Sequence, residues 1–520
     1  MRRMRARRIV VAVTVALAAA LAASAPAAAA DFNVTSETIY QSYAVRTLYG
    51  ASPVEYKTRV TESLGLTATR LGGDGGLTVV ARLRYDVDFG LVDECDAGGV
   101  IAPLPYTTGI SSPPYEPSRR LLCGNALEIQ LLYVEGARLF GGLIDFRAGR
   151  QWKVDPLGWF AFDGALVTVR LPFFFSATLA AGFDAVNGLL FARNPWQPDG
   201  TAVRVDGPPE AVGATAELAH DFSLHPSPFV SAGLAGGFGR AHAEVVYRHV
   251  FGASLRTLAP LDEARAVSFG WGDEEERIGW AVTYGFSDSF RVRAQVVADL
   301  LWPRFDEVTL EASARLLDAR LGVRGGVAFL RPRFSASSVF YYYDFRPTAD
   351  AYVRADLHAG EWAWLYLRAA VRQFGNTWRF GSGRDTGDTF VDSGSTIDYG
   401  PAIDAGVRLE LGSVMLDVNE FSAFGFAGKD VGGMVSASWN VLPNRVSLLA
   451  SGYVSYYDNV LQRDPSGTPL QAGVFGGASL GIDYKFSTGA RIRLTAEDHL
   501  SPFWHSNARV YGVLDLSFWL

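Results

Sequence analysis

Arginines recur at alternate positions in several segments of this chain, opposite apolar residues. Arg291 and Arg293, for example, alternate with Val292 and Ala294. A guanidinium group stays charged at any biological pH, so several of them around a water-filled pore would favour anions. The arginines of this kind, and thus the predicted pore-lining residues, are Arg82, Arg84, Arg291, Arg293, Arg315, Arg320, Arg324, Arg354, Arg368, Arg372, Arg491 and Arg493.

A second interpretation of the same arginines is structural. If these segments are strands of one wall, each arginine could pair with an inward-facing acid on a neighbouring strand. Such a pair would stiffen the wall instead of attracting a solute. The acids available for such pairs are Asp86, Glu311, Asp356, Glu410 and Glu497. Acidic residues outnumber Lys and Arg by 54 to 47, which favours pairing over a sharply anion-selective pore.

The arginines must be positioned by β-strands, because the apolar residues around them repeat every second position. Residues 77–89 are apolar at every odd position and mostly polar or charged at the even ones. Successive side chains of a strand point to opposite faces, so such a segment has one apolar and one polar face. It is also much longer than the roughly five or six residues of an ordinary strand. The same pattern occurs in 290–302, 308–316, 351–358, 363–372 and 490–497.

So many long two-faced strands, most of them joined by short turns, predict an all-β fold in which a wall separates lipid from water. We expect a transmembrane antiparallel β-barrel of about 22–24 strands, an even number as in bacterial single-chain barrels. No break in composition divides residues 31–520, which are therefore predicted to form one barrel domain. The longer connections are 90–126, 184–211, 375–398 and 458–471, and barrels of this kind place long loops outside and short turns on the periplasmic side.

Residues 1–30 are predicted to be a cleaved signal peptide. Five arginines precede an apolar stretch from Ile9 to Ala23, and the small residues Ala28 to Ala30 precede Asp31. An uncleaved anchor is the alternative, although Pro26 argues against it. Loss of these residues changes the formal charge from −7 to −12, because they contain five arginines and no acid. So acidic a chain is not expected to bind nucleic acid.

The only two cysteines lie in one predicted loop, 90–126. An even number in an exported chain predicts a disulfide between Cys95 and Cys123, with two unpaired thiols as the alternative. The loop also contains five prolines, which restrict its conformations. It could fold into the lumen and narrow it, or form an external cap.

Catalytic chemistry has little support in the sequence. The seven histidines are scattered and no serine lies in a Gly-x-Ser-x-Gly elbow, although a triad assembled from distant strands would leave no such trace. The acids of 375–398 do not have the spacing of a calcium loop. We therefore predict no catalytic residue, no metal site and no cofactor.

Two segments resemble known families. The last strand, 510–520, alternates to the end of the chain and resembles the insertion signal of Gram-negative outer-membrane proteins, although Leu520 stands where that signal prefers an aromatic residue. The residues Gly149-Arg150-Gln151, followed by Phe162-Asp163-Gly164, resemble a pattern of porin-like and exporter-like barrels. This resemblance covers about two dozen of the 520 residues and does not identify a substrate.

Together, the barrel pattern and these resemblances predict a porin-like channel in the cell outer membrane for passive diffusion of small hydrophilic solutes. The partners implied are outer-membrane lipid and lipopolysaccharide, the solutes, and the outer-membrane insertion machinery. An export or assembly barrel is the alternative function, and a barrel enzyme is a more remote one. A receptor with a plug domain is disfavoured, because strand-like alternation already begins near Lys57.

Overall fold

The computed structural model describes residues 31–45, 55–71, 76–88, 126–172, 174–185, 227–253, 271–300, 304–331, 348–374, 398–425, 428–459, 472–487, 489–501 and 504–519. The predicted signal peptide, both cysteines and the loop 90–125 lie outside these residues, so the expectations for them remain predictions. In the described part of the chain, no helix is both long and apolar enough to span a membrane.

The described chain forms 22 antiparallel strands and one short helical turn, α4 (Leu139–Gly142). The strands are β1 (Asp31–Val45), β2 (Glu55–Leu71), β3 (Leu77–Asp88), β4 (Ala126–Arg138), β5 (Ile144–Asp155), β6 (Gly158–Arg170), β7 (Phe175–Asp184), β8 (Pro228–Phe238), β9 (Ala241–Ala253), β10 (Trp271–Gly285), β11 (Phe290–Asp299), β12 (Arg304–Leu316), β13 (Leu321–Leu330), β14 (Thr348–His358), β15 (Ala363–Phe374), β16 (Asp398–Leu411), β17 (Val414–Gly425), β18 (Gly428–Leu442), β19 (Val446–Asn459), β20 (Ala472–Ser487), β21 (Ala490–Ser501) and β22 (Trp504–Trp519).

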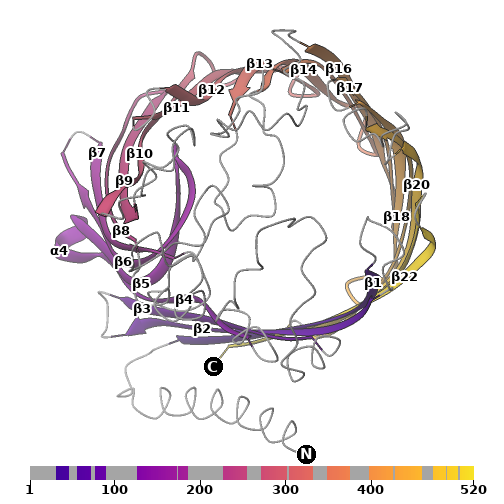
Figure 1. Cartoon of the computed structure of the whole chain (residues 1–520), viewed down its shortest axis with the longest axis horizontal. Helices are drawn as coiled ribbons and strands as arrows, with labels where there is room; N and C mark the ends of the chain where they lie inside the picture. Colours follow the sequence, from indigo (N-terminus) through magenta and orange to yellow (C-terminus); the bar gives the residue numbers. More distant parts are fainter. Residues whose placement is uncertain are drawn as a thin grey trace, which may run out of the picture.

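Each strand pairs with the next along the chain, and the ring is closed by β1 and β22. In that last pairing Asn33 lies opposite Trp519 and Ser42 opposite Val510. Seen down its axis, the molecule is a ring of strands in which the first and last strands lie side by side (Figure 1). The 22 strands confirm the predicted fold class and the lower end of the predicted strand number. Closure removes the open sheet edges that cannot exist in lipid.

The connections differ in length between the two ends of the barrel. At one end, which we call the turn side, neighbouring strands are joined by short turns such as 239–240, 412–413 and 443–445. At the other end, the loop side, the connections include 89–125, 185–227 and 375–397. This confirms the predicted short turns, including the turn at Ser287, where the hydroxyl accepts the backbone N–H of Phe290 at 2.9 Å.

One face of the wall is apolar and exposed. Leu310, Val353, Leu367 and Leu480 are each about half exposed or more, although such side chains usually avoid water. Exposed aromatic side chains concentrate toward the two ends of this face. On the turn side they are Phe140, Phe174, Phe238, Phe286, Trp439 and Phe486, and on the loop side Phe305, Tyr399, Phe424 and Tyr456. An apolar band between two aromatic girdles is the surface of a barrel that spans a membrane.

Candidate functional site

The polar side chains of the wall share the inner face. Thr35, Glu37, Ser63, Arg82 and Arg491 all line an open cavity of about 870 Å³ along β20–β22 and β1–β3, so their side of the sheet is the concave one. Residues directly opposite each other in neighbouring strands point to the same face. The register therefore places the polar face of every other strand in the lumen as well, and the lumen is the candidate functional site.

Eight of the twelve predicted pore-lining arginines lie within ion-pair distance of an acid. On β14 and β15, Arg354 lies 2.7 Å from Asp356, Arg372 lies 2.7 Å from Asp350, and Arg368 lies 2.9 Å from Asp404. The others are Arg82 with Glu37, Arg84 with Glu128, Arg324 with Glu311, and both Arg491 and Arg493 with Asp483. Over much of the lumen, the arginines thus stiffen the wall as pairs, which is the second interpretation given above.

The other four predicted arginines do not lie within ion-pair distance of an acid of the described residues. Arg291, Arg293 and Arg315 lie in the turn-side halves of β11 and β12, Arg320 ends the turn before β13, and all four are exposed. Arg293 donates to the amide oxygen of Gln295 at 3.1 Å. Among the described residues, no carboxylate lies within 4.0 Å of any of the four guanidinium groups, so this part of the wall carries a surplus of positive charge.

Arginines and tyrosines interleave on β14 and β15. The Arg354 guanidinium lies 4.9 Å from the centre of the Tyr366 ring, and that of Arg368 lies 5.3 Å from the centre of the Tyr352 ring. The Tyr352 hydroxyl donates to Glu311 at 2.5 Å. Cation–π contacts add to the ion pairs of the same arginines and hold their long side chains in place.

The hairpin of β5 and β6 leaves the wall partway along its length. The two strands pair with each other over their whole length, from Ile144 opposite Val169 to Asp155 opposite Gly158. However, β4 pairs with β5 only up to Arg150, and β7 pairs with β6 only from Phe162. Residues 151–161, which we call the lumenal hairpin, therefore have no wall strand on either side.

The lumenal hairpin lies against the inner face of β8–β11. Lys153 donates to the hydroxyl of Ser231 on β8 at 2.7 Å, and Gln295 on β11 donates to the carbonyl oxygen of Pro156 at 3.2 Å. Leu157 at its tip is buried with Val246 and Val297. In Figure 1 this segment arcs inside the ring, next to β8–β10.

An aromatic cluster fixes the base of the lumenal hairpin. Phe160 and Phe162 of β6 pack edge-on against Phe229 of β8, with ring centres 4.9 and 5.0 Å apart. The Arg248 guanidinium lies 4.2 Å from the centre of the Phe160 ring. Phe162 and Phe229 are almost completely buried, so this contact resembles the core of a soluble protein more than a pore wall.

Small residues allow the bend at which the hairpin turns inward. Gly149 has φ +126°, a conformation that other residues rarely adopt, and a Cβ there would collide with the carbonyl oxygen of Leu132. Gly164 and Gly182 lie beside it across β6 and β7, each against the backbone of the other strand. Three glycines side by side let three strands curve together at one level of the wall.

Arg150 and Asp163 close the gap that the departing hairpin leaves. Their side chains form two hydrogen bonds of 2.6 Å, and the second terminal nitrogen of Arg150 donates to the carbonyl oxygen of Ile129 on β4 at 3.1 Å. The two side chains are only 3% and 2% exposed. A buried ion pair of this geometry satisfies the charges that burial would otherwise leave uncompensated.

The face of the lumenal hairpin that points away from β8–β11 is apolar and exposed. Trp152, Val154 and Trp159 are 46%, 68% and 66% exposed, and the register of β5 and β6 puts them on one face. Lys153 and Phe160 point the other way and dock on the wall. The two indoles therefore face the lumen, although they continue the lipid-facing positions of the same strands.

The sequence analysis missed this hairpin and placed the possible narrowing element in loop 90–126, which lies outside the described residues. The signal was nevertheless present, because the Gly149-Arg150-Gln151 and Phe162-Asp163-Gly164 segments supply the bend and its ion pair. Among the described residues, no group of three or more His, Cys, Asp and Glu side chains is placed to hold a metal ion.

The solved structures that match this chain include an outer-membrane protein and a porin. OpdK from Pseudomonas aeruginosa matches at 8% identity and a TM-score of 0.40, over 95% of this chain and 99% of that one. A BenF-like porin from Pseudomonas fluorescens Pf-5 matches at 10% and 0.40, over 94% and 99%. OccAB4 from Acinetobacter baumannii matches at 8% and 0.40, over 94% and 98%. No protein-family model and no curated protein matches the sequence.

The strand pairings themselves define the class of this protein. It is a closed, antiparallel 22-stranded β-barrel with an apolar outer band and a charged lumen, as outer-membrane porins are.

Proposed function

We propose that this protein is an outer-membrane channel for passive diffusion of small hydrophilic solutes, narrowed by its lumenal hairpin. The observation that carries the proposal is the contrast between the two faces of the closed wall. The outer face exposes Val353 and Leu367, while the inner face of the same two strands carries Arg354 and Arg368 with their acids. A wall built in this way holds water on one side and lipid on the other.

The number of strands makes the lumen wide enough to hold water beside the hairpin. Barrels of about eight strands are filled by their own side chains, and those of 16 or more enclose an aqueous channel or a plug. Here the lumenal hairpin covers one side of the wall, at β8–β11, and is held there by Lys153 and Leu157. The wall of β14 and β15, which carries Arg354 and Arg368, remains polar, and we propose that solutes pass between this part of the wall and the hairpin.

The two aromatic girdles support insertion into the outer membrane. They make lipid and lipopolysaccharide the expected neighbours of the outer face, and the outer-membrane insertion machinery the expected route to it. The proposal assigns no catalytic residue and no cofactor. Its solutes are hydrophilic, because paired charges such as Arg372 and Asp350 line the lumen, and small, because the lumenal hairpin narrows it.

Swelling of proteoliposomes tests this function. Vesicles that contain the purified barrel are diluted into isotonic solutions of arabinose, glucose, sucrose and raffinose. We expect swelling that slows as the solute becomes larger, because a narrowed lumen sieves by size. Vesicles with heat-unfolded protein are the control. Absence of swelling with arabinose would contradict the diffusion channel and favour an export or assembly barrel.

A further inference from the structure

Positive side chains gather at the turn-side end of the lumen on three neighbouring strands. Arg445 ends the turn between β18 and β19, Lys485 lies on β20, and Arg491 and Arg493 lie on β21. Arg445 and Lys485 line a cavity of about 520 Å³, and the same two residues also border the 870 Å³ cavity next to it. We call these four residues the turn-side cation cluster.

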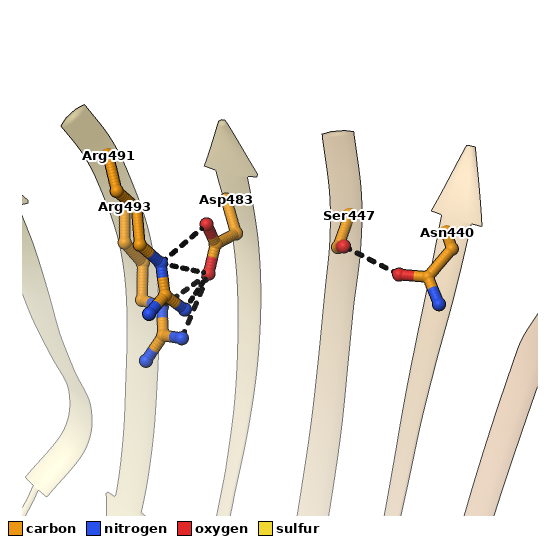
Figure 2. A network of polar contacts seen from close by, with 5 residues as sticks. All are labelled: Asn440, Ser447, Asp483, Arg491 and Arg493. Atoms are coloured by element: carbon orange, nitrogen blue, oxygen red, sulfur yellow. Dashed lines mark hydrogen bonds and ion pairs between the residues drawn. The ribbon is translucent and has the colours of Figure 1, made fainter. Parts of the chain in front are cut away.

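The acid inside this cluster is already neutralised. Asp483 is the only carboxylate among the residues that line the smaller cavity, and it is 6% exposed. It accepts hydrogen bonds from Arg491 at 2.8 and 2.9 Å and from Arg493 at 2.9 and 3.2 Å. Figure 2 shows both guanidinium groups converging on this one carboxylate. Two positive charges on one negative charge leave a surplus before Lys485 and Arg445 are counted.

The larger cavity does not remove the surplus. Its lining contains two acids, Glu37 and Asp515. Glu37 lies 3.6 Å from Arg82, and Asp515 lies opposite Arg491 in the β21–β22 register. Among the described residues, no carboxylate lies within 4.0 Å of Arg445 or Lys485. These two side chains are the charges available to a solute.

The register places Lys485 beside the arginines of the cluster. Lys485 on β20 lies directly opposite Arg491 on β21. Asp483 compensates the charge of Arg491, whereas no carboxylate of the described residues lies within ion-pair distance of Lys485. Both side chains border the larger cavity, so an anion bound there would meet the uncompensated charge of Lys485.

A polar donor completes the cluster. The Ser447 hydroxyl donates to the amide oxygen of Asn440 at 2.7 Å, which fixes the orientation of that amide. The amide nitrogen of Asn440 then keeps its two N–H donors, and in Figure 2 it points away from Ser447. Asn440 lines the smaller cavity together with Arg445 and Lys485. Two cations and a carboxamide suit a ligand with several acceptor oxygens.

We propose that the turn-side cation cluster is a binding subsite for phosphate-type oxyanions, with Arg445 and Lys485 as its two charged contacts and Asn440 as a neutral donor. A phosphoryl group has three strong acceptor oxygens and nearly two negative charges, which matches this donor set better than a halide does. The proposal rests on the proposed function, in that solutes must reach the lumen. It makes the turn-side end a place where phosphate, or a phosphate ester, pauses during passage.

Calorimetry of the detergent-solubilised barrel tests the subsite without requiring conduction. Inorganic phosphate is titrated into the wild type, the double variant Arg445→Gln/Lys485→Gln and the control Lys429→Gln. Lys429 lies at the loop side, where its ammonium group is 4.9 Å from the centre of the Tyr456 ring, so its replacement removes charge far from the cluster. We expect saturable binding to the wild type and the control, and about tenfold or greater weakening in the double variant.

The variant Arg445→Lys/Lys485→Arg exchanges the two cations and keeps both charges, so it should retain most of the phosphate binding. If the double variant with glutamines lost binding only because it misfolded, the exchange variant would be expected to lose binding as well. The single variant Lys485→Gln gives a second, milder measurement if the double variant does not fold. Equal phosphate affinity in the wild type and Lys485→Gln would overturn the subsite, as would chloride binding as tight as phosphate. Glucose 6-phosphate and glucose, titrated in parallel, distinguish a phosphate ester from free phosphate as the ligand.

The outcomes for the subsite and for the channel are separable. In one outcome, the vesicles swell while the Arg445 and Lys485 substitutions leave phosphate binding unchanged. That result overturns the subsite and leaves the channel. Charge-dependent phosphate binding without swelling overturns passive diffusion and leaves the subsite as part of another transport function.

Discussion

Arg150 and Asp163 form a two-point ion pair at the level where β5 and β6 leave the barrel wall. Both hydrogen bonds measure 2.6 Å, and the wall pairings end at these residues or next to them. Where the strands separate, backbone groups lose their ladder partners, and the Arg150 guanidinium takes over one of them, the carbonyl of Ile129. The pair thus connects the bend of the lumenal hairpin to the wall that it leaves.

Replacing Arg150 with Met should destabilise the barrel strongly. The substitution leaves Asp163 buried without its counter-charge, which costs on the order of 3–5 kcal/mol. The double variant Arg150→Met/Asp163→Leu should cost much less, because no unpaired charge remains. Urea unfolding in lipid vesicles, followed by tryptophan fluorescence, measures both. Similar losses in the two variants would show that the ion pair matters for its shape and not for its charge.

A charge on the lipid face should be far more costly than the same charge in the lumen. Ala294 lies on the outer face of β11, and Ala328 lies on the inner face of β13, opposite Asp350. Ala294→Arg should cost roughly 2–4 kcal/mol near the middle of the membrane, and Ala328→Arg should be tolerated. Gln295, the neighbour of Ala294, is a poorer control because it contacts the lumenal hairpin. The unfolding free energies in lipid decide the matter, and equal costs would mean that the faces are wrongly assigned.

Removing the unpaired arginines of β11 should shift the ion selectivity of the lumen toward cations. In Arg291→Gln/Arg293→Gln two fixed positive charges are lost, and the described structure places no carboxylate in ion-pair contact with either. The reversal potential in a salt gradient across a planar bilayer measures the shift. Lys429→Gln, which lies outside the lumen, should leave the potential unchanged. An unchanged potential in the double variant would place these arginines away from the solute path.

The ring of strands was predictable from sequence because alternation reports which face of a strand meets lipid. The lumenal hairpin was not, since alternation continues through the bend: Trp152 and Trp159 keep the outward positions of β5 and β6 and yet face the lumen. Alternation shows which residues share a face of a strand. The bend at Gly149 determines whether that face lies against lipid or in the lumen.

The pairing of the arginines with acids was only partly predictable from the sequence. That acids would neutralise many of them was foreseeable from composition, but which ones depends on register and neighbours. Arg368 meets Asp404 because β15 and β16 bring them opposite each other, whereas Arg354 reaches Asp356 along its own strand. The Cys95–Cys123 disulfide lies outside the described residues and stays a prediction, which labelling of free thiols in the unfolded, oxidised protein would test.

The central claim is that the barrel encloses a water-filled path narrowed by the lumenal hairpin. Single-channel conductance in planar bilayers tests it most directly, with the wild type compared to a variant in which residues 151–161 are replaced by a two-residue turn. Because the hairpin fills part of the lumen beside β8–β11, we expect the wild type to conduct and the shortened variant to conduct more. Absence of conductance in both proteins would contradict the account.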